Sequence, residues 1–483
     1  MSAGRPQASC LLPSFGDRQI SLQGAPMSRL ALLTHQRAED ILAYRHNRPI
    51  TVSEFLADVR QLAAALPAGR HILNACSDRY RFAVGMAAAL LTDRISLLPS
   101  TLTPDMVSQL KTFAPDVFCL TDQPQSIDLP QFAWADGVSA RAPAPAGPAA
   151  MCLDIPQIPA AQTAAIVFTS GSTGAPVAHR KSWGGLVQSV RAEAATLGLL
   201  DGRSHCIVAT VPPQHMYGFE STVLIALQSG SALHAAHPFY PVDICAALAA
   251  AVQPCMLVTT PVHLKVLLAS GLDIPLPHLV LSATAPMPPQ LALAVEARLQ
   301  APLLEIYGST ETGQIASRRT TNGPEWTLFP GVSLNTSQGR VWASGEHIEQ
   351  AMPMGDEIEL LAGARFLLHG RSADLVNIAG KRSSLDYLNY QLNAVPGVID
   401  GAFFMPDEDP GDHITRLTAF AVAPGMAAPA LLAALRQRID TIFMPRPLVM
   451  LEALPRNSTG KLPREVLAAL LQAHRRTRAL HER

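Results

Sequence analysis

A run of small and hydroxyl residues follows an apolar segment and is suited to phosphate binding. Ile166-Val167-Phe168 are apolar and largely β-forming, and Thr169-Ser170-Gly171-Ser172-Thr173-Gly174 come directly after them. This pattern predicts a buried strand that ends in a flexible loop. Glycines let such a loop expose backbone N–H groups, and its four hydroxyls add donors for a polyanion. Taken alone, the loop is equally compatible with an ordinary Ser/Gly connection.

Two further strand-to-loop transitions carry polar side chains. Residues 206–211 predict a strand that ends at Pro212-Pro213, with His215 on the loop that follows. Residues 303–306 predict a strand leading into a small-residue loop that carries Tyr307 and Glu311. In open α/β sheets, ligands bind at the carboxyl ends of strands. Beside a triphosphate, Glu311 is a suitable Mg²⁺ ligand; without one, it is a solvated loop acid. His215 is either a ligand-binding residue at the strand end or a structural histidine.

The elements around these loops alternate between strands and helices, which predicts an α/β fold with a parallel sheet. Ser53 is expected to cap the helix that carries Phe55, Leu56 and Val59 on one face. Past Trp326 the pattern changes to short strands separated by Gly and Pro, and a polar break follows at residues 370–374. We therefore predict a large N-terminal α/β domain with layered sheets over residues 1–369. A small α+β C-terminal domain over residues 370–483 is joined to it by a hinge.

Composition excludes several classes of protein. The chain has 483 residues, 48% hydrophobic and 16% charged, with a formal net charge of −1, which is typical of a globular protein. A net charge this close to zero gives no strong electrostatic attraction to nucleic acid or to a membrane surface. Its seven cysteines are scattered without a C-x-x-C pair, which argues against a disulfide framework or zinc site. Lacking a recognisable signal or an apolar run long enough to span a bilayer, the chain is expected to be soluble and cytoplasmic.

The motifs, taken in order, resemble those of the adenylate-forming (AMP-binding) ligases, the family of acyl- and aryl-CoA synthetases. Matching segments cover nearly the whole chain: Phe168 to Gly174, Pro212 to Gly218, Tyr307 to Glu311, Gly355-Asp356, Gly370-Arg371 with Asp374, Gly380 with Arg382, and Pro455 to Arg464. The combination in this order is far more specific than any one motif. A Walker NTPase is excluded, since Gly460-Lys461 is followed by Leu462.

The resemblance implies a function. Family members join a carboxylic acid to ATP, giving an acyl-adenylate and pyrophosphate, and then usually pass the acyl group to a thiol. Here the implied substrates are ATP with Mg²⁺ and a small aryl or aliphatic acid. The acceptor is CoA or the phosphopantetheine of a separate acyl carrier protein, because the chain contains no carrier domain of its own.

The resemblance also implies residue roles. Lys461, on a mobile loop, would bridge the carboxylate and the α-phosphate, and His215 would close the acyl pocket. Glu311 would hold Mg²⁺. The remaining implied nucleotide-binding residues are Thr169, Ser170, Gly171, Ser172, Thr173 and Gly174 for the phosphates, Tyr307 with Ala283, Thr284 and Ala285 for adenine, Gly308, Ser309 and Thr310 beside the α-phosphate, Asp356 and Arg371 for the ribose, and Arg382.

The chain departs from the family at two positions. The usual lysine of the phosphate loop is replaced by Val177, and the hinge position is Ala373. We hypothesise that Arg180 or Lys181 supplies the missing cation, because both lie within a few residues. For the acyl pocket we expect apolar walls from Met216, Tyr217, Phe219 and residues 282–285. Apart from Glu220, no acidic residue stands where it could anchor the α-amine as in amino-acid-activating relatives, so an aryl or medium aliphatic acid is expected.

Two alternatives stand beside the ligase hypothesis. A non-catalytic nucleotide-binding relative would be consistent with Val177 and Ala373. A serine hydrolase is suggested by Ser170-Gly171-Ser172-Thr173-Gly174, which nearly matches the G-x-S-x-G pattern, but the first glycine is missing and no Asp/His pair follows in a recognisable context.

Overall fold

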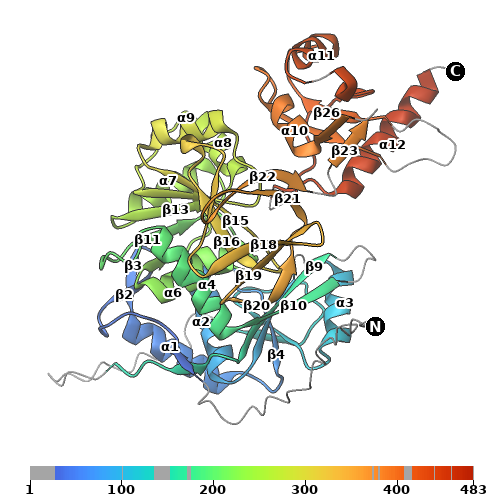
Figure 1. Ribbon diagram of the computed structural model, residues 1–483. Helices are drawn as coiled ribbons and strands as arrows, with labels where there is room; N and C mark the ends of the chain where they lie inside the picture. Colours follow the sequence, from blue (N-terminus) through green and yellow to red (C-terminus); the bar gives the residue numbers. More distant parts are fainter. Residues whose placement is uncertain are drawn as a thin grey trace, which may run out of the picture.

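A computed structural model describes residues 28–99, 102–134, 153–170, 176–371, 375–378, 381–406, 416–439, 441–457 and 460–481. Figure 1 shows a large body, blue to orange along the chain, and a smaller orange-to-red part that carries α10, β23, β26, α11 and α12. The layered α/β body and the smaller α+β part that the sequence predicts are both confirmed.

The first large sheet has six strands in the order β10-β9-β5-β4-β6-β7. Its strands are β4 (His71–Asn74), β5 (Ile95–Leu98), β6 (Phe118–Thr121), β7 (Gln131–Ala133), β9 (Thr163–Ser170) and β10 (Pro176–Ser182). Its pairings are parallel except that β10 runs back antiparallel to β9. Helix α3 (Pro104–Phe113) packs Val107 and Leu110 on one face of this sheet, against Leu73 and Leu97. A short ladder pairs β1 (Arg29–Ala31) with β8 (Gln157–Pro159).

The second large sheet has eleven strands in the order β21-β22-β17-β16-β15-β14-β13-β11-β12-β2-β3. Its strands are β2 (Ile41–Arg45), β3 (Arg48–Thr51), β11 (Cys206–Ala209), β12 (Ala232–His234), β13 (Cys255–Thr259), β14 (Leu279–Ser282), β15 (Leu303–Ser309), β16 (Gly313–Arg318), β17 (Trp326–Leu328), β21 (Asp356–Leu360) and β22 (Arg365–Arg371). The run from β15 to β2 is parallel, so the loops after these strands leave the sheet at one edge. The outer face is covered by α7 (Pro241–Ala250), α8 (Pro261–Ala269) and α9 (Pro289–Leu299).

Apolar helices fill the space between the two sheets. These are α2 (Arg79–Leu91), α4 (Trp183–Thr196), the π-helical turn η1 (Phe219–Leu224) and α6 (Ile225–Ser229), and their side chains share one core with both sheets. Phe82 and Phe219 meet edge to face in this core, 6.2 Å apart. The assignment of Phe219 to the acyl pocket is therefore wrong, because its ring is fully buried in packing.

Helix α1 (Val52–Ala65) begins earlier than expected. Thr51, not Ser53, is the N-cap: its hydroxyl accepts a hydrogen bond from the Glu54 N–H, and the Glu54 carboxylate accepts one from the Thr51 N–H at 2.9 Å. This reciprocal capping box satisfies two helix-end donors, which Ser53 could not do from inside the first turn.

The C-terminal part is built separately from the large sheets. Hairpin β23 (Leu375–Ile378) and β24 (Lys381–Ser384) precedes a sheet of β25 (Asp400–Phe404), β26 (Thr418–Val422) and β27 (Leu448–Met450). Around it lie α10 (Leu385–Asn393), α11 (Ala428–Arg436) and α12 (Arg464–His481). A further sheet of β18 (Val332–Ser337), β19 (Arg340–Gly345) and β20 (Ile348–Pro353) belongs to the large body.

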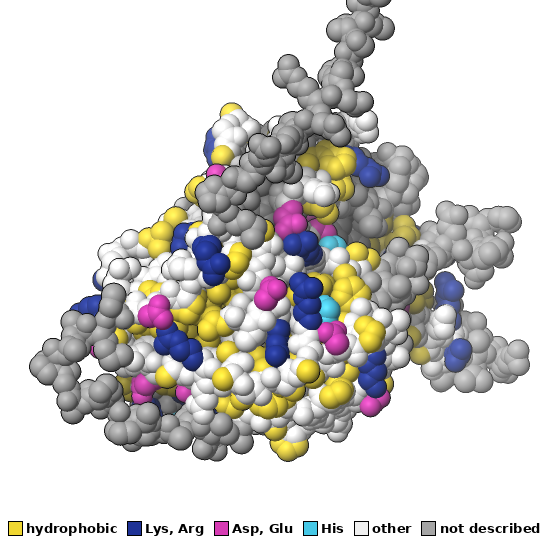
Figure 2. Space-filling view, turned by 90° about the horizontal axis from the view of Figure 1, so that it is seen from below, with side chains coloured by type: hydrophobic (Ala, Val, Ile, Leu, Met, Phe, Trp, Pro, Cys, Tyr) yellow, Lys and Arg dark blue, Asp and Glu magenta, His cyan; other side chains and the backbone are white. Residues whose placement is uncertain are grey.

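The described surface has mixed charge. On the face in Figure 2, Lys and Arg side chains are interspersed with Asp and Glu and with apolar groups, in keeping with the net charge of −1. Among the described helices, none has both the length and the apolar character needed to cross a membrane.

A buried arginine at the start of α2 ties this helix to two strand ends of the eleven-stranded sheet. The Arg79 side chain is fully buried and donates to the carbonyls of Ala209 (3.1 Å) and Val211 (2.8 Å) at the end of β11. It also donates to the carbonyls of His234 (3.0 Å) and Ala236 (2.8 Å) at the end of β12. Burial lowers the pKa of Arg79 to about 10, which still leaves it charged at neutral pH. Arg79 therefore fixes the strand end from which the His215 loop departs.

We expect Arg79→Met to destabilise the protein by about 3 kcal/mol or more, because it removes the donors to several buried carbonyls. The matched control is Arg203→Met, which breaks an exposed ion pair with Asp201 and is expected to change stability by less than about 1 kcal/mol. Urea unfolding of both variants measures the difference. Equal stability of the two variants would contradict the role assigned to Arg79.

Candidate functional site

The predicted phosphate loop connects two paired strands. Thr169 pairs with Val177 in the β9–β10 ladder, so the two described ends of the predicted loop lie side by side in the six-stranded sheet. Gly171, Ser172, Thr173 and Gly174 lie outside the described residues, as does the side chain of Ser170.

A histidine that the sequence analysis missed links this loop to the predicted Mg²⁺ ligand. His179 Nε2 lies 2.9 Å from the Thr169 hydroxyl and 3.7 Å from Glu311 Oε1. Burial lowers the pKa of His179 although the Glu311 carboxylate opposes the shift, so the ring is neutral at pH 7. Strand alternation after Val177 could have identified it, because residues 177, 179 and 181 share one face of β10.

Of the two cations considered as replacements for the loop lysine, only Lys181 faces the site. Its ammonium donates to the backbone carbonyl of Glu311 at 3.0 Å. Burial lowers the pKa of Lys181, and the carboxylates of Glu220 and Glu311 oppose that shift. Arg180 points to the other side of the strand and donates to the carbonyl of Ala161 at 3.3 Å.

The loop that carries Glu311 is closed by its own side chains. Ser309 and Thr312 exchange hydrogen bonds, each backbone N–H donating to the other's hydroxyl at 3.2 Å. A Cβ on Gly308 would lie 2.2 Å from the carbonyl oxygen of Gly313, so only glycine fits there. Thr310 and Glu311 are left partly exposed at the tip of the loop.

A single carboxylate at this tip fits Mg²⁺ bound together with ATP. In the described part of the chain, no group of three His, Cys, Asp or Glu side chains is placed to hold a metal. Magnesium commonly takes one or two protein carboxylates and completes its shell with substrate phosphates and water. Glu311, next to the end of the phosphate loop, matches that donor set.

The residues assigned to adenosine come together between β15 and β21. The Tyr307 hydroxyl donates to Asp356 Oδ2 at 2.5 Å, and Asp356 lies opposite Arg371 in the β21–β22 ladder. The rings of Trp326 and Phe366 support Tyr307 at 5.5 and 5.6 Å. Arg371 and Arg382 belong to β22 and β24, and their side chains lie outside the described residues.

The segment after β14 carries a strained residue. Thr284 has φ of 77°, which is rare for a residue with a branched Cβ and is often found at functional sites. Its side chain is exposed, whereas Ala283 is buried and Ala285 is partly exposed. Next to this segment, the Tyr217 hydroxyl donates to the carbonyls of Thr259 (3.2 Å) and Leu281 (3.1 Å), which ties the His215 loop to β13 and β14.

His215, near the middle of the chain, and Lys461, in its C-terminal part, lie near each other. Burial lowers the pKa of His215, and the positive charge of Lys461 lowers it further. The Lys461 loop turns at Gly460 (φ 76°), where a Cβ would come within 3.1 Å of Val262 on α8. Arg456 donates to the Gly460 carbonyl at 3.0 Å and pairs with Asp400 at 2.7 Å. The C-terminal part thus places Lys461 over the large body.

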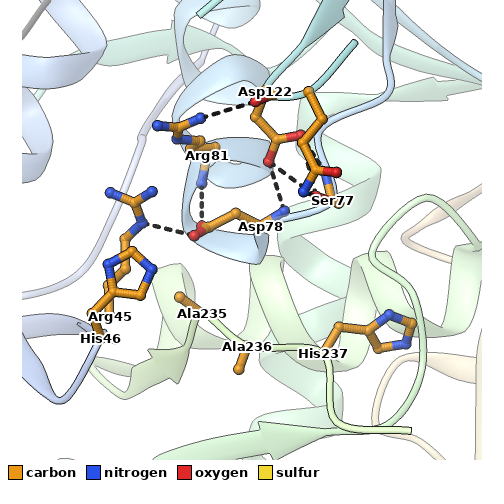
Figure 3. Close-up of a pocket in the computed structure, with 10 residues that line it drawn as sticks. Arg45, His46, Ser77, Asp78, Arg81, Asp122, Ala235, Ala236 and His237 are labelled. Atoms are coloured by element: carbon orange, nitrogen blue, oxygen red, sulfur yellow. Dashed lines mark hydrogen bonds and ion pairs between the residues drawn. The ribbon is translucent and has the colours of Figure 1, made fainter. Parts of the chain in front are cut away.

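A separate pocket of about 490 Å³ lies at the ends of β4, β6 and β12 (Figure 3). It is lined by Arg45, His46, Ser77, Asp78, Arg81, Asp122, Gln123, Ala235, Ala236 and His237, none of which is a predicted site residue. Its charged groups already satisfy one another: Arg45 pairs with Asp78 at 2.7 Å, and Asp122 accepts from the backbone of Ser77 and Asp78, both at 2.9 Å. We assign no ligand to it.

Comparison with known proteins identifies a family. Residues 33–348 match the family described as AMP-binding enzyme. The chain is 30% identical over 305 residues to the 4-coumarate–CoA ligase of Rhodobacter capsulatus, a match that covers 62% of this chain and 75% of that enzyme. It is 24% identical over 357 residues to a 4-chlorobenzoate–CoA ligase of Arthrobacter sp, covering 64% and 66%.

Solved structures show the same fold. ATP-bound MatB from Rhodopseudomonas palustris superposes with a TM-score of 0.74 at 19% identity, covering 89% of this chain and 95% of that one. The o-succinylbenzoate CoA synthetase MenE from Bacillus subtilis gives 0.73 at 18% identity, covering 89% and 95%. At these identities the likeness concerns the fold alone. The family match, however, spans more than half of the sequence, and the chain belongs to the AMP-binding enzyme family of adenylate-forming ligases.

Proposed function

We propose that this protein activates a carboxylic acid with ATP to an acyl-adenylate and then transfers the acyl group to a thiol. The observation that carries the proposal is the position of the Lys461 loop, which packs Gly460 against Val262 on α8 and brings the charge of Lys461 close enough to lower the pKa of His215, in addition to burial. Phosphoryl-type transfer needs positioned charge more than proton transfer, and a lysine beside this loop supplies it.

In the first step an oxygen of the acid attacks the α-phosphorus, and the bond to the β-phosphate breaks to release pyrophosphate. Lys461 would hold the carboxylate against the phosphate and offset the charge that develops. Thr169 and the loop after it would hold the leaving pyrophosphate, and Asp356 with Arg371 would fix the ribose. Mg²⁺ held by Glu311 would neutralise phosphate charge.

In the second step a thiol attacks the acyl carbon, loses its proton and displaces AMP. CoA is the proposed acceptor, because relatives of this chain are named CoA ligases; a carrier protein's phosphopantetheine offers the same thiol. We further propose that residues 370–483 turn about the segment near Ala373 between the steps and withdraw Lys461. Such domain movement around a ligand is a common hinge closure.

The proposed acid is an aryl acid. The relatives named for coumarate and for chlorobenzoate support this class, as does the aromatic Tyr217 directly after the His215 turn. An aliphatic acid is the second candidate, which Met216 at the same turn favours.

Acid-dependent exchange of pyrophosphate into ATP tests the first step across a panel of aryl and aliphatic acids. We expect exchange with at least one aryl acid, and we expect Lys461→Ala to reduce its kcat by about 10²- to 10³-fold, the usual effect of losing a transition-state charge contact. Lys111→Ala is the matched control, because Lys111 is far from Lys461 in the sequence and makes only an exposed ion pair with Asp128.

Other outcomes separate the alternatives. ATP binding without exchange for any acid would favour a non-catalytic nucleotide-binding relative. Labelling by a fluorophosphonate that is lost in Ser170→Ala or Ser172→Ala would favour a serine hydrolase.

Lys181 and Arg180 provide a second test. Lys181→Met removes the donor to the Glu311 carbonyl, so we expect at least about a tenfold loss in exchange rate, the equivalent of one charge-assisted hydrogen bond. Arg180→Met changes the other face of the same strand and is expected to alter the rate less than about twofold. If both variants keep the wild-type rate and ATP KM, neither cation compensates for Val177.

A further inference from the structure

A lysine on helix α8 joins the large body to the C-terminal part, and the mechanism above does not use it. The Lys265 ammonium donates to the backbone carbonyl of Ile399, the residue directly before β25. Val262 lies three residues earlier on the same face of α8 and packs against Gly460, the residue before Lys461. One face of α8 therefore touches the C-terminal part at two points.

The two contact points are also connected inside the C-terminal part. Asp400, which follows Ile399, accepts two hydrogen bonds from the Arg456 guanidinium, at 2.7 and 2.8 Å. A third nitrogen of the same guanidinium donates to the Gly460 carbonyl at 3.0 Å. A planar guanidinium held at three nitrogens has little freedom to turn. The backbone just before Lys461 is thus fixed relative to the start of β25.

The Lys461 loop is closed by Asn457. The Asn457 side chain accepts a hydrogen bond from the Lys461 N–H at 2.8 Å, and its backbone N–H donates to the Lys461 carbonyl at 2.9 Å. The Asn457 carbonyl accepts from the Gly460 N–H at 2.8 Å. The loop therefore moves as a unit with Arg456 and β25, and a contact that places β25 on α8 also places the Lys461 backbone.

The Lys265 contact is strong enough to favour one orientation and weak enough to break. Burial lowers the pKa of Lys265, the Asp400 carboxylate opposes that shift, and the Arg456 guanidinium adds to it. Because Asp400 and Arg456 together are neutral and Lys265 keeps an exposed side chain, the net attraction is modest. An exposed hydrogen bond of 3.3 Å from Tyr390 on α10 to Gln290 on α9 adds to the docking.

We infer that Lys265 is a positioning residue for Lys461. It holds the C-terminal part in the orientation used to form the adenylate, and its contact with Ile399 breaks before the thiol attacks. The inference rests on the proposed function, in which the C-terminal part turns between the two steps. An enzyme that uses both orientations in each turnover keeps them close in free energy, so one modest contact shifts their populations.

Lys265→Met tests the contact, because it removes the ammonium and keeps a long apolar side chain. Losing one such hydrogen bond changes the ratio of the two orientations by about fivefold to tenfold. From an even starting ratio, the fraction in the adenylating orientation falls by about threefold to fivefold. We expect kcat for acid-dependent pyrophosphate exchange to fall by that factor. Lys265→Arg keeps a charged donor and should keep most of the rate, and Lys111→Met, at an exposed ion pair, is the control.

The thiol step should respond in the opposite direction. When the adenylating orientation is weakened, the fraction outside it rises from about one half to about nine tenths. Single-turnover transfer from supplied acyl-adenylate to CoA should therefore be unchanged or up to about twofold faster in Lys265→Met. A lysine that only supported folding would slow both steps together.

A double-mutant comparison tests whether Lys265 acts through Lys461. In Lys461→Ala the residual exchange no longer uses the lysine that Lys265 is inferred to position. Adding Lys265→Met to this variant should therefore change the residual rate by less than about 1.5-fold, the non-additivity expected of coupled residues.

The outcomes separate this inference from the proposed function. An unchanged exchange rate in Lys265→Met, no recovery in Lys265→Arg, equal slowing of both steps, or the same loss of exchange with and without Lys461 each overturn the inference and leave ligase activity standing. Absence of exchange with every acid in the wild-type enzyme overturns both. Absence of transfer to CoA in the wild-type enzyme overturns CoA as the acceptor, and the exchange rates of the single and double variants then decide the inference.

Discussion

The fixed strand ends on which the site depends are held by one buried cation. Arg79 lies between the two large sheets and donates to the last carbonyls of β11 and β12, so both strand ends are tied to α2. Guanidinium suits this role because its planar fork reaches several acceptors at once and stays charged when buried. The His215 loop begins directly after β11, so its position depends on this anchored strand end.

The loop that carries Glu311 is organised by contacts from the other large sheet. His179, which is hydrogen-bonded to Thr169 on the neighbouring strand, lies 3.7 Å from the Glu311 carboxylate, while Lys181 donates to the Glu311 backbone carbonyl. In the family pattern a lysine stands at the position of Val177. Lys181, farther along β10, is buried and is acted on by the carboxylates of both Glu220 and Glu311. Its donation to the Glu311 carbonyl connects β10 with the Glu311 loop.

Burial decides the state of two carboxyl groups behind the Glu311 loop. Glu193 and Glu220 are both buried, which raises the pKa of Glu193 to about 8 and that of Glu220 to about 7. Neighbouring side chains oppose both shifts, but the positive charge of Lys181 acts on Glu220. The shift is therefore smaller for Glu220, because its neighbours include a cation.

The sequence alone determined the alternating α/β pattern and the order of the motifs, because these depend on local periodicity and short-range spacing. The roles predicted for Glu311, Asp356 and Lys461 came from the resemblance of those motifs to the adenylate-forming ligases. The sequence also marked the loss of the lysine at Val177. It could not determine that Lys181 rather than Arg180 turns toward Glu311, or that His179 joins Thr169 to Glu311, since the face of a strand becomes meaningful only against its partner. The surroundings of Phe219 and Glu193 could not be predicted from the sequence for the same reason. They are formed by α2, α4 and β16, which are far apart in the chain and meet only in the folded protein.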